Sequence, residues 1–389
     1  MKVRLGDYIN EYSVRNKANE DIPVYSVTNT QGFCSDYFGK EVASKDKTTY
    51  KIVPKGCFAY NPSRINVGSV DWQRTEDKVI VSPLYNVFYV SDEINKQYLY
   101  YYLKSDITLQ RIKTVATGSV RDNLKLDMLS EFPIELPDKK EQSLIVDILD
   151  KTKQVIALRK KELSALDELI KARFVELFGD ITTGSYKYET KKLGDVANVG
   201  SSHRVFTTEF VDSGIPFYRG TEIGELANGL KPTKTYYISE QHYNRLTSDD
   251  TKPQIGDLLM PSICNKGQVW MVNTDEPFYY KDGRVLCISP NKKIFNTKYL
   301  EYFMRAKTLI EYPKLGSGST FAEFKIFSVK DMDVLIPPRE VQKRFADFVN
   351  QIDKSKVLSE THIFYAEKSI TPTTTKIFLK GRCIYGNEF

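Results

Sequence analysis

The stretch IELPDKKEQ at residues 134–142 returns in altered form as VLIPPREVQ at residues 334–342. Pro137 and Gln142 of the first stretch correspond to Pro337 and Gln342 of the second. The residues that follow the first stretch, up to Phe178, contain neither proline nor glycine, which is typical of a long helix. A boundary motif that occurs twice predicts that the chain contains the same structural unit twice.

Further matches extend this repeat through both copies. The offset between them is about 190 residues near the start of each copy and 200 residues further along. A period of this length is too long for a solenoid repeat, so we expect two copies of one domain, each followed by the same connecting element. The matched pairs are RLGDY (4–8) with KLGDV (192–196), IPVYSVT (22–28) with IPFYRGT (215–221), VPKGCF (53–58) with PQIGDL (253–258), and ATGSV (116–120) with GSGST (316–320).

The connecting element after the first copy is predicted to be one long helix over residues 138–178. Apolar side chains recur there in alternating steps of four and three residues, which is the spacing of a coiled-coil seam. Forty residues of helix would measure roughly 60 Å, so the helix would act as a spacer. The apolar positions expected to form the helix interface are Ile145, Leu149, Ile156, Leu163, Leu166, Ile170 and Leu177.

A second helix is expected after the second copy, with Phe345, Phe348 and Ile352 on its interface. Its partner would be the first helix, which gives an antiparallel two-helix stalk. Beyond about Leu358 the heptad pattern ends, and the segment that follows contains Pro372 within a TPTTT stretch. We therefore expect a second helix that is regular to about residue 358, followed by an irregular tail.

Within each copy, short runs of β-forming residues alternate with turn residues and helical patterns. Strands are predicted at 78–83, 85–90, 268–273 and 283–290, and matched helices at 95–112 and 296–312. The predicted fold is α/β (α+β), with two tandem homologous domains joined by long helices that form an antiparallel coiled-coil stalk. The predicted boundaries are 1–137 for the first domain, 138–180 for the central helix, 181–337 for the second domain, and 338–389 for the second helix and tail.

Composition narrows the class of protein. The chain of 389 residues has a formal net charge of +6, but neither domain is strongly basic once the chain is divided at the repeat. No run approaches the roughly 20 apolar residues that span a bilayer, so we expect no membrane association and a cytoplasmic location. Five dispersed cysteines and three histidines argue against a disulfide framework and a metal site.

The sequence lacks the common catalytic motifs: there is no GxxxxGK[ST], HExxH, GxSxG or GxGxxG. Asn61-Pro62 is similar to the Asn-Pro-Pro-aromatic element of amino-methyltransferases, but Ser63-Arg64 replaces the Pro-aromatic half and no glycine-rich cofactor segment accompanies it. We favour a loop that presents Asn61, Ser63 and Arg64 to a ligand over a methyltransferase site. On residue type alone, a plain turn is favoured over both.

Two polar, glycine-containing segments suggest nucleic-acid binding. TGSVRDNLK (117–125) and GSGSTFAEFK (316–325) occupy the same place in both copies, just before the return to the long helices. Backbone amides in such loops can contact phosphates, and Arg121, Asn123 and Lys125 are residue types that contact bases or neutralise phosphate. For each charged residue taken alone, a solvated surface side chain is the favoured interpretation, and the matched location in both copies supports the two loops as a pair.

Taken together, the ordered motifs resemble the specificity subunit of type I restriction-modification systems. The resemblance extends from Val3 to about Leu358 and depends on [RK]LGD, IPxY, the glycine-serine loop, the Pro-to-Gln boundary and the intervening helix. It implies that each globular copy recognises one half of a bipartite double-stranded DNA target. By type and loop context, further candidate DNA contacts are Arg219, Lys266, Arg284 and Ser319.

The same resemblance implies a non-catalytic chain that works with partner subunits. The helices would set the spacing between half-sites and dock two methyltransferase subunits, which restriction and translocase subunits join. S-adenosylmethionine, ATP and Mg would belong to those partners, and this chain would bind no cofactor. Two alternatives remain at this point: a fused restriction or methyltransferase polypeptide with its own catalysis, and a coiled-coil scaffold with no role at DNA.

Overall fold

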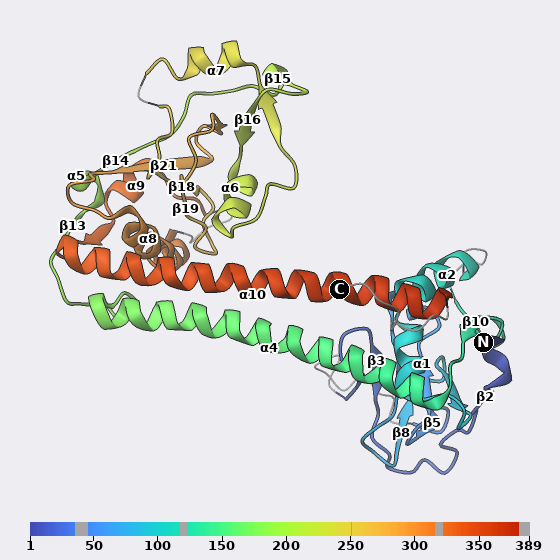
Figure 1. Cartoon of the computed structure of the whole chain (residues 1–389). Coiled ribbons are helices and arrows are strands. Elements are labelled where there is room, and N and C mark those ends of the chain that lie inside the picture. The colour runs from blue at the N-terminus through green and yellow to red at the C-terminus, as the bar shows by residue number, and fades with distance from the viewer. Residues whose placement is uncertain (36–45, 117–122, 250, 316–321, 381–389) are drawn as a thin grey trace. The chain divides into compact units, whose positions relative to one another are not determined.

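The computed structural model describes residues 1–35, 46–116, 123–249, 251–315 and 322–380, with the backbone alone for residues 116 and 369–380. Its contacts divide the chain into two compact units. One consists of Met1–Glu162 together with the helical residues from Leu358 onwards, and the other of Leu163–Val357. Each unit therefore contains one domain and a segment of each of the two long helices (Figure 1).

The first domain is built around an antiparallel sheet with the strand order β2-β9-β6-β7. Two smaller pairs, β3 with β4 and β5 with β8, extend its β structure. The strands are β1 (Lys2–Arg4), β2 (Ile9–Glu11), β3 (Ser26–Thr28), β4 (Gly32–Cys34), β5 (Lys51–Pro54), β6 (Phe58–Tyr60), β7 (Val70–Trp72), β8 (Lys78–Val81), β9 (Asn86–Val90) and β10 (Pro133–Glu135). The helices are η1 (Leu5–Asp7), η2 (Ile65–Val67), α1 (Lys96–Leu103), α2 (Asp106–Ala116) and α3 (Leu126–Ser130).

The second domain repeats this sheet in the order β14-β21-β18-β19 and adds a second sheet, β15-β17-β16-β20. Its strands are β13 (Thr190–Lys192), β14 (Ala197–Gly200), β15 (Phe210–Val211), β16 (Ile215–Tyr218), β17 (Tyr236–Ile238), β18 (Leu258–Pro261), β19 (Trp270–Met271), β20 (Tyr279–Tyr280), β21 (Val285–Pro290) and β22 (Asp333–Leu335). Its helices are α5 (Leu193–Val196), η3 (Thr207–Glu209), α6 (Gly220–Ala227), α7 (Glu240–Leu246), α8 (Thr297–Glu311), η4 (Tyr312–Leu315) and α9 (Ile326–Lys330). A short hairpin, β11 (Gly179–Asp180) with β12 (Ser185–Tyr186), precedes it.

The [RK]LGD motif has the same structural role in both domains. β1 pairs antiparallel with β10, and β13 pairs antiparallel with β22, so the start of each domain lies beside its end. A Cβ atom added to Gly6 would lie 2.9 Å from the Cβ of Ser130, and one added to Gly194 would lie 3.0 Å from the Cβ of Lys330. The glycine is therefore required because the backbone passes close to the short helix α3 or α9.

The matched helices of the two domains differ in one respect. Residues 296–312 form the single helix α8, but residues 95–112 are divided between α1 and α2. Buried Ser105 lies at the break, where its hydroxyl accepts a hydrogen bond from the backbone N–H of Thr108 at 3.4 Å and donates one to the carbonyl of Tyr102 at 2.7 Å. Serine favours such a helix start over a helix interior, which explains the interruption.

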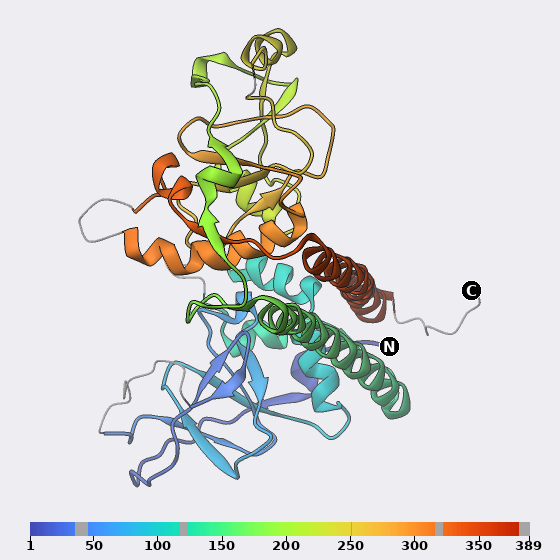
Figure 2. The ribbon, with the colours of Figure 1, turned by 90° about the vertical axis from the view of Figure 1, so that its left-hand side faces the viewer.

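The two long helices are α4 (Lys139–Phe178) and α10 (Arg339–Lys380), and they run side by side in opposite directions (Figures 1 and 2). In the second unit Asp167 of α4 pairs with Lys356 of α10. In the first unit Lys160 Nζ lies 2.9 Å from Glu367 Oε1. Because lower-numbered residues of α4 meet higher-numbered residues of α10, the pairing is antiparallel, as predicted from the heptad pattern.

The predicted irregular tail after residue 358 is wrong for residues 359–380, which continue α10. The heptad pattern is obscured because polar residues occupy interface positions. Ser359 is buried and donates a hydrogen bond to Glu162 Oε2 at 3.2 Å, and Ile363, one step further, is also buried. Pro372 lies within the helix although proline removes one helical hydrogen bond.

Candidate nucleic-acid interface

Asn61, Ser63 and Arg64 lie in the connection that follows β6. The side-chain oxygen of Asn61 accepts a hydrogen bond from the backbone N–H of Ser63 at 3.1 Å, which forms a local turn. η2 begins directly after Arg64, and Gly68 ends it with a φ of +88° that favours glycine. Ser63 and Arg64 are exposed. This turn geometry directs two polar side chains to solvent, as a ligand-contacting loop requires.

A second predicted segment lies against this turn. The Ser63 hydroxyl donates a hydrogen bond to Asn123 Oδ1 at 2.6 Å, and the backbone N–H of Leu124 donates to the carbonyl of Pro62 at 3.2 Å. Lys125 is exposed at the start of α3. The structure therefore brings together five of the predicted residues in what we call the first loop pair, residues 61–69 with 123–125. Arg121, also predicted, lies outside the described residues.

The second domain contains the corresponding second loop pair, residues 261–268 with 322–325. The backbone N–H of Phe324 donates to the carbonyl of Ser262 at 2.8 Å, in the way that Leu124 donates to Pro62. Each of these residues lies 200 positions from its counterpart. The same backbone hydrogen bond therefore joins the two segments of the loop pair in both domains, whatever side chains the segments have.

The side chains of the two loop pairs differ. Glu323 replaces Asn123, and its Oε2 accepts hydrogen bonds from Arg284 at 2.8 Å and from the Ser262 hydroxyl at 3.4 Å. Lys325 forms an ion pair with the same carboxylate. The hydrogen bond from Lys325 and the charge of Arg284 hold the pKa of Glu323 below its ordinary value. The sequence prediction included Arg284 but missed Glu323, although an acid two residues before a lysine in this loop was a visible signal.

Lys266 lies in the exposed turn of the second loop pair, where its backbone N–H donates to Gln268 Oε1 at 2.9 Å. The remaining candidate of this loop, Ser319, lies outside the described residues. For Lys266 and Arg284 the structure gives loop positions with exposed side chains, as predicted. Their contact with DNA stays a prediction.

Arg219 is placed differently from the other candidates. It precedes α6, and its guanidinium donates to both carboxylate oxygens of Glu222, at 3.2 and 2.8 Å. Burial opposes ionisation of Glu222, but the hydrogen bonds from the side chain and backbone of Arg219 outweigh it and hold the pKa of Glu222 below its ordinary value. The guanidinium also lies 4.3 Å from the ring centroid of Tyr236. These contacts position Arg219 within its own domain.

The predicted interface residues of the long helices are all buried or half-buried. Ile145 and Leu149 pack into the core of the first domain, while Ile170, Phe345 and Ile352 pack into the core of the second. The other predicted positions, Ile156, Leu163, Leu166, Leu177 and Phe348, are half-buried.

The helix interface also contains an aromatic contact that the sequence prediction missed. The ring of Phe174 lies 5.3 Å from that of Phe345. Phe174 lies between the predicted interface positions Ile170 and Leu177 and was not among them.

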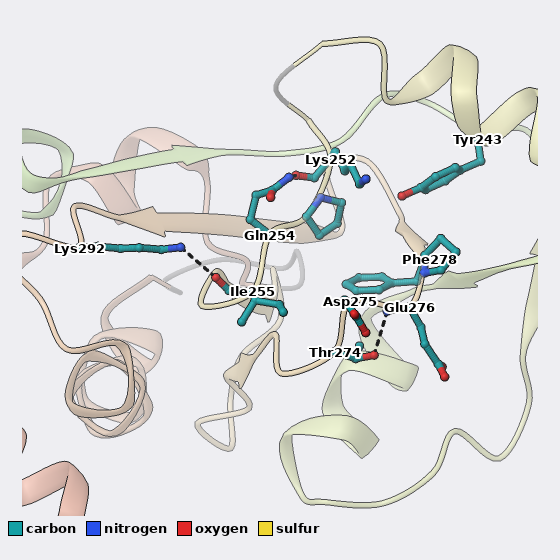
Figure 3. A pocket seen from close by; sticks show the side chains of 11 residues that line it. Tyr243, Lys252, Gln254, Ile255, Thr274, Asp275, Glu276, Phe278 and Lys292 are labelled. Atoms are coloured by element: carbon teal, nitrogen blue, oxygen red, sulfur yellow. Dashed lines mark hydrogen bonds between the residues drawn. The ribbon is translucent and has the colours of Figure 1, made fainter.

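One hollow of the second domain lies apart from the predicted residues. It has a volume of about 240 Å³, and its lining includes Lys252, Lys292, Asp275 and Glu276 (Figure 3). Lys292 donates a hydrogen bond to the carbonyl of Ile255 at 3.2 Å. Two lysines and two acids give this lining no uniform attraction for a polyanion, so the loop pairs remain the better candidates.

The described part of the chain contains no metal cluster, disulfide or membrane-spanning helix. Its side chains include no group of three or more His, Cys, Asp or Glu that could hold a metal ion. The four cysteines within it, at positions 34, 57, 264 and 287, are not bridged. No helix there is long and apolar enough to cross a membrane.

A comparison against known protein families agrees with the repeat of two domains. Residues 2–168 and 186–363 each match the type I restriction modification DNA specificity domain. The chain belongs to this family. It is a specificity subunit of a type I restriction-modification system, a non-catalytic subunit with two DNA-recognition domains.

Individual relatives agree with this assignment. The type I restriction enzyme MjaIX specificity subunit of Methanocaldococcus jannaschii is 24% identical to this specificity subunit over 341 residues, which cover 82% of this chain and 76% of the relative. A chain from a structural study of complex assembly and conformational transition of the type I R-M system has a TM-score of 0.62 at 16% identity and covers 98% of both chains. The S subunit from M. genitalium has a TM-score of 0.54 at 13% identity, with 97% and 96% covered. The two structures share the fold.

Proposed function

We propose that each domain of this specificity subunit recognises one half of a bipartite double-stranded DNA target through its loop pair. The observation that carries the proposal is the combination of an identical backbone contact with different side chains. Leu124 with Pro62 and Phe324 with Ser262 close the two loop pairs in the same way, whereas Asn123 and Glu323 present different chemistry. A common scaffold with different side chains is what two unlike half-sites require.

The long helices would set the distance between the two half-sites, since a rigid connection between two reading elements fixes their spacing on DNA. They would also dock two methyltransferase subunits. Exposed apolar side chains support this, because each unit has its own set on α4 and α10. The first unit has Leu158, Leu358, Phe364 and Tyr365, and the second unit has Leu169, Val175 and Val357.

The chemistry would belong to the partners. Methyltransferase subunits would bind S-adenosylmethionine, and restriction and translocase subunits would use ATP and Mg, while this chain binds none of these cofactors. A subunit that recognises DNA in such a complex would work in the cytoplasm. Two expectations distinguish this proposal from a self-sufficient enzyme and from a scaffold: the chain alone transfers no methyl group, and with its methyltransferase it prefers one DNA sequence.

Mapping of methylated positions in the host genome tests the proposal directly. We expect one bipartite motif with a fixed gap, which disappears when the gene for this chain is deleted. Gel-shift assays of the assembled complex at several salt concentrations provide the second test, because sequence-independent binding weakens with salt. Methylation of DNA by the isolated chain would contradict the proposal. The proposal would also be contradicted if competitor DNA of any sequence abolished binding to the same extent.

A further inference from the structure

Three cationic side chains of the first unit converge on the ring of Tyr100. Arg74 follows β7, Lys104 follows α1, and Lys153 belongs to α4. Their charged groups lie 5.2, 5.1 and 5.4 Å from the ring centroid, respectively. Three segments distant in the sequence thus place three positive charges around one aromatic ring, and we call Arg74, Lys104 and Lys153 the cation cluster.

Acidic side chains neutralise this cluster only in part. Arg74 pairs with Asp71 at 2.8 Å. Lys104 donates instead to an uncharged group, the carbonyl of Asn29, at 2.8 Å. Lys153 lies 4.2 Å from the ring centroid of Tyr101, whose hydroxyl bonds to Asp150. Within the described residues, neither Lys104 nor Lys153 takes part in an ion pair.

The electrostatic state of the lysines agrees with this geometry. Desolvation and repulsion from Lys104 and Arg74 lower the pKa of Lys153 to about 8, against a weaker opposite effect of Asp150. Desolvation likewise lowers the pKa of Lys104; the attraction of Asp71 opposes this effect, and Arg74 adds a weaker repulsion. Positive groups that disfavour one another in this way are stabilised by a bound anion.

The second domain offers a comparison at the matched positions. Asn296 matches Asn95, and Gln342 matches Gln142. Counted from these residues, the second domain has Glu301 in place of Tyr100, Arg305 in place of Lys104 and Asp353 in place of Lys153. Glu301 pairs with Arg305 at 2.6 Å and with Lys298 at 3.3 Å, and Lys298 lies 3.8 Å from Asp353. The second domain is therefore neutral where the first is cationic, so the shared fold does not require the cation cluster.

The cation cluster adjoins the first loop pair. A Cβ atom added to Gly68, near the end of the segment that contains Arg64, would lie 3.4 Å from Lys104 Cε. Polyanionic DNA that contacts Arg64 would therefore have further phosphates within reach of Lys104 and its neighbours, since successive phosphates of one strand follow the bases at short intervals.

We propose that Arg74, Lys104 and Lys153 bind a backbone phosphate of DNA beside the half-site that the first domain recognises. The proposal rests on the proposed function of the first loop pair, and it adds a contact that fixes position without reading sequence. The second domain lacks this contact at the matched place. The protein would then contact the two half-sites differently. The first half-site would receive this phosphate contact in addition to base contacts, and the second would not receive it.

The test compares Lys104→Gln and Lys153→Gln with the unmodified full chain, each assembled with its methyltransferase subunits. The dependence of DNA affinity on salt is measured for target DNA and for scrambled DNA. Each variant should lower the slope of log K against log salt by about 0.9. Each should also weaken affinity roughly tenfold on both DNAs, so that the preference for the target is unchanged. Lys153→Arg should retain the wild-type slope.

Lys151→Gln is the matched control, because Lys151 is exposed on the same helix and pairs with Asp147 at 2.7 Å. It changes the net charge equally but should leave the slope unchanged. The proposal is overturned if both glutamine variants keep the wild-type slope, or if Lys151→Gln lowers it as much. Loss of inorganic phosphate or ATP binding in Lys153→Gln with an unchanged DNA slope would overturn it too, in favour of a mononucleotide. Failure of the wild-type complex to prefer its target would instead contradict the proposed function itself.

Discussion

Gln142 and Gln342 make the same three hydrogen bonds in the two domains. The side-chain oxygen of Gln142 accepts from the backbone N–H of Asn95 at 2.7 Å, and that of Gln342 accepts from Asn296 at 2.7 Å. The amide nitrogen of each donates to the carbonyl of the preceding proline, five residues earlier, at 2.9 and 2.8 Å, and to one further carbonyl. Both glutamines are buried. The repeated boundary motif thus attaches the start of each long helix to its domain.

Replacement of either glutamine by leucine should destabilise its unit. Leucine keeps the volume but removes all three hydrogen bonds of the side chain, each of which typically contributes about 0.5 to 1.5 kcal/mol. Chemical denaturation of the full chain measures the loss of free energy of unfolding. Gln154→Leu and Gln351→Leu, on exposed positions of the same helices, should change it by less than about 0.5 kcal/mol. Equal effects at buried and exposed positions would contradict the assigned role.

Arg64→Ala should weaken recognition of one half-site only. If Arg64 contacts a base edge, the loss is about 1 to 3 kcal/mol of discrimination at the affected base pair. Competition binding with DNA in which each half-site is scrambled separately measures this loss. Arg4→Ala is a control in the same domain, because Arg4 is exposed and pairs with Glu131. Loss at both half-sites would show that Arg64 supports folding or assembly instead.

Arg219→Ala should lower stability, because it leaves the buried carboxylate of Glu222 without its partner. We expect a loss of about 1 to 3 kcal/mol at pH 7. Arg245→Ala should change stability by less than about 0.5 kcal/mol, since Arg245 is largely exposed and its pair with Glu209 is long, at 3.5 Å. A stable Arg219→Ala protein that loses one half-site would show that Arg219 contacts DNA, as its residue type first suggested.

The pH dependence of the same pair has a definite sign. Because the pKa of Glu222 is lower in the folded chain than in the unfolded chain, its contribution to stability is complete above about pH 4.3, the ordinary value for glutamate. The contribution decreases as the pH falls through the folded value. Arg219→Ala removes the guanidinium but keeps the backbone hydrogen bonds to Glu222, so burial is opposed less strongly and the pKa of Glu222 is higher than in the unmodified chain. Acidification should therefore cost this variant less. Denaturation curves at pH 7 and below pH 4 measure the difference, and parallel losses in both proteins would contradict this account.

Ile363 and Phe364 allow the extended part of α10 to be tested. Ile363 is buried and Phe364 is 53% exposed. Ile363→Ala should destabilise the chain by about 2 kcal/mol or more, whereas Phe364→Ala should change stability little. If the exposed apolar set docks a methyltransferase subunit, Phe364→Ala should instead weaken assembly, which analytical ultracentrifugation of the mixed subunits measures. Equal stability of both variants would show that α10 beyond Leu358 does not support the unit.

Much of the fold could be predicted from the sequence because it depends on local pattern. The repeat and the long first helix follow from matched motifs and from the heptad spacing around Ile156 and Leu163. The extension of α10 could not be predicted, because Lys356 and Ser359 occupy interface positions and are satisfied by carboxylates of the other helix. No pattern in one helix reveals a partner that lies almost two hundred residues away.

The candidate site was predictable to a smaller extent. The turn at Asn61 and the segment around Asn123 were each visible, but no pattern in the sequence predicted that they contact each other. The cation cluster was not visible, because Arg74, Lys104 and Lys153 belong to three separate elements that only the folded chain brings to Tyr100. The pairing of Arg219 with Glu222 was not visible, because a glutamate three residues later in a helix is common and only its burial shows that the pair is internal.

The division of each long helix between two units affects the order in which the chain can fold during synthesis. The residues from Leu358 onwards belong to the first unit, where Ser359 and Glu367 pair with Glu162 and Lys160 of α4. The ribosome makes the whole of residues 163–357 between these two parts of the first unit. At roughly 5 to 20 residues per second, that interval lasts about 10 to 40 seconds. During this time the nascent first unit exposes an apolar helix face that either a chaperone or another subunit of the complex can bind.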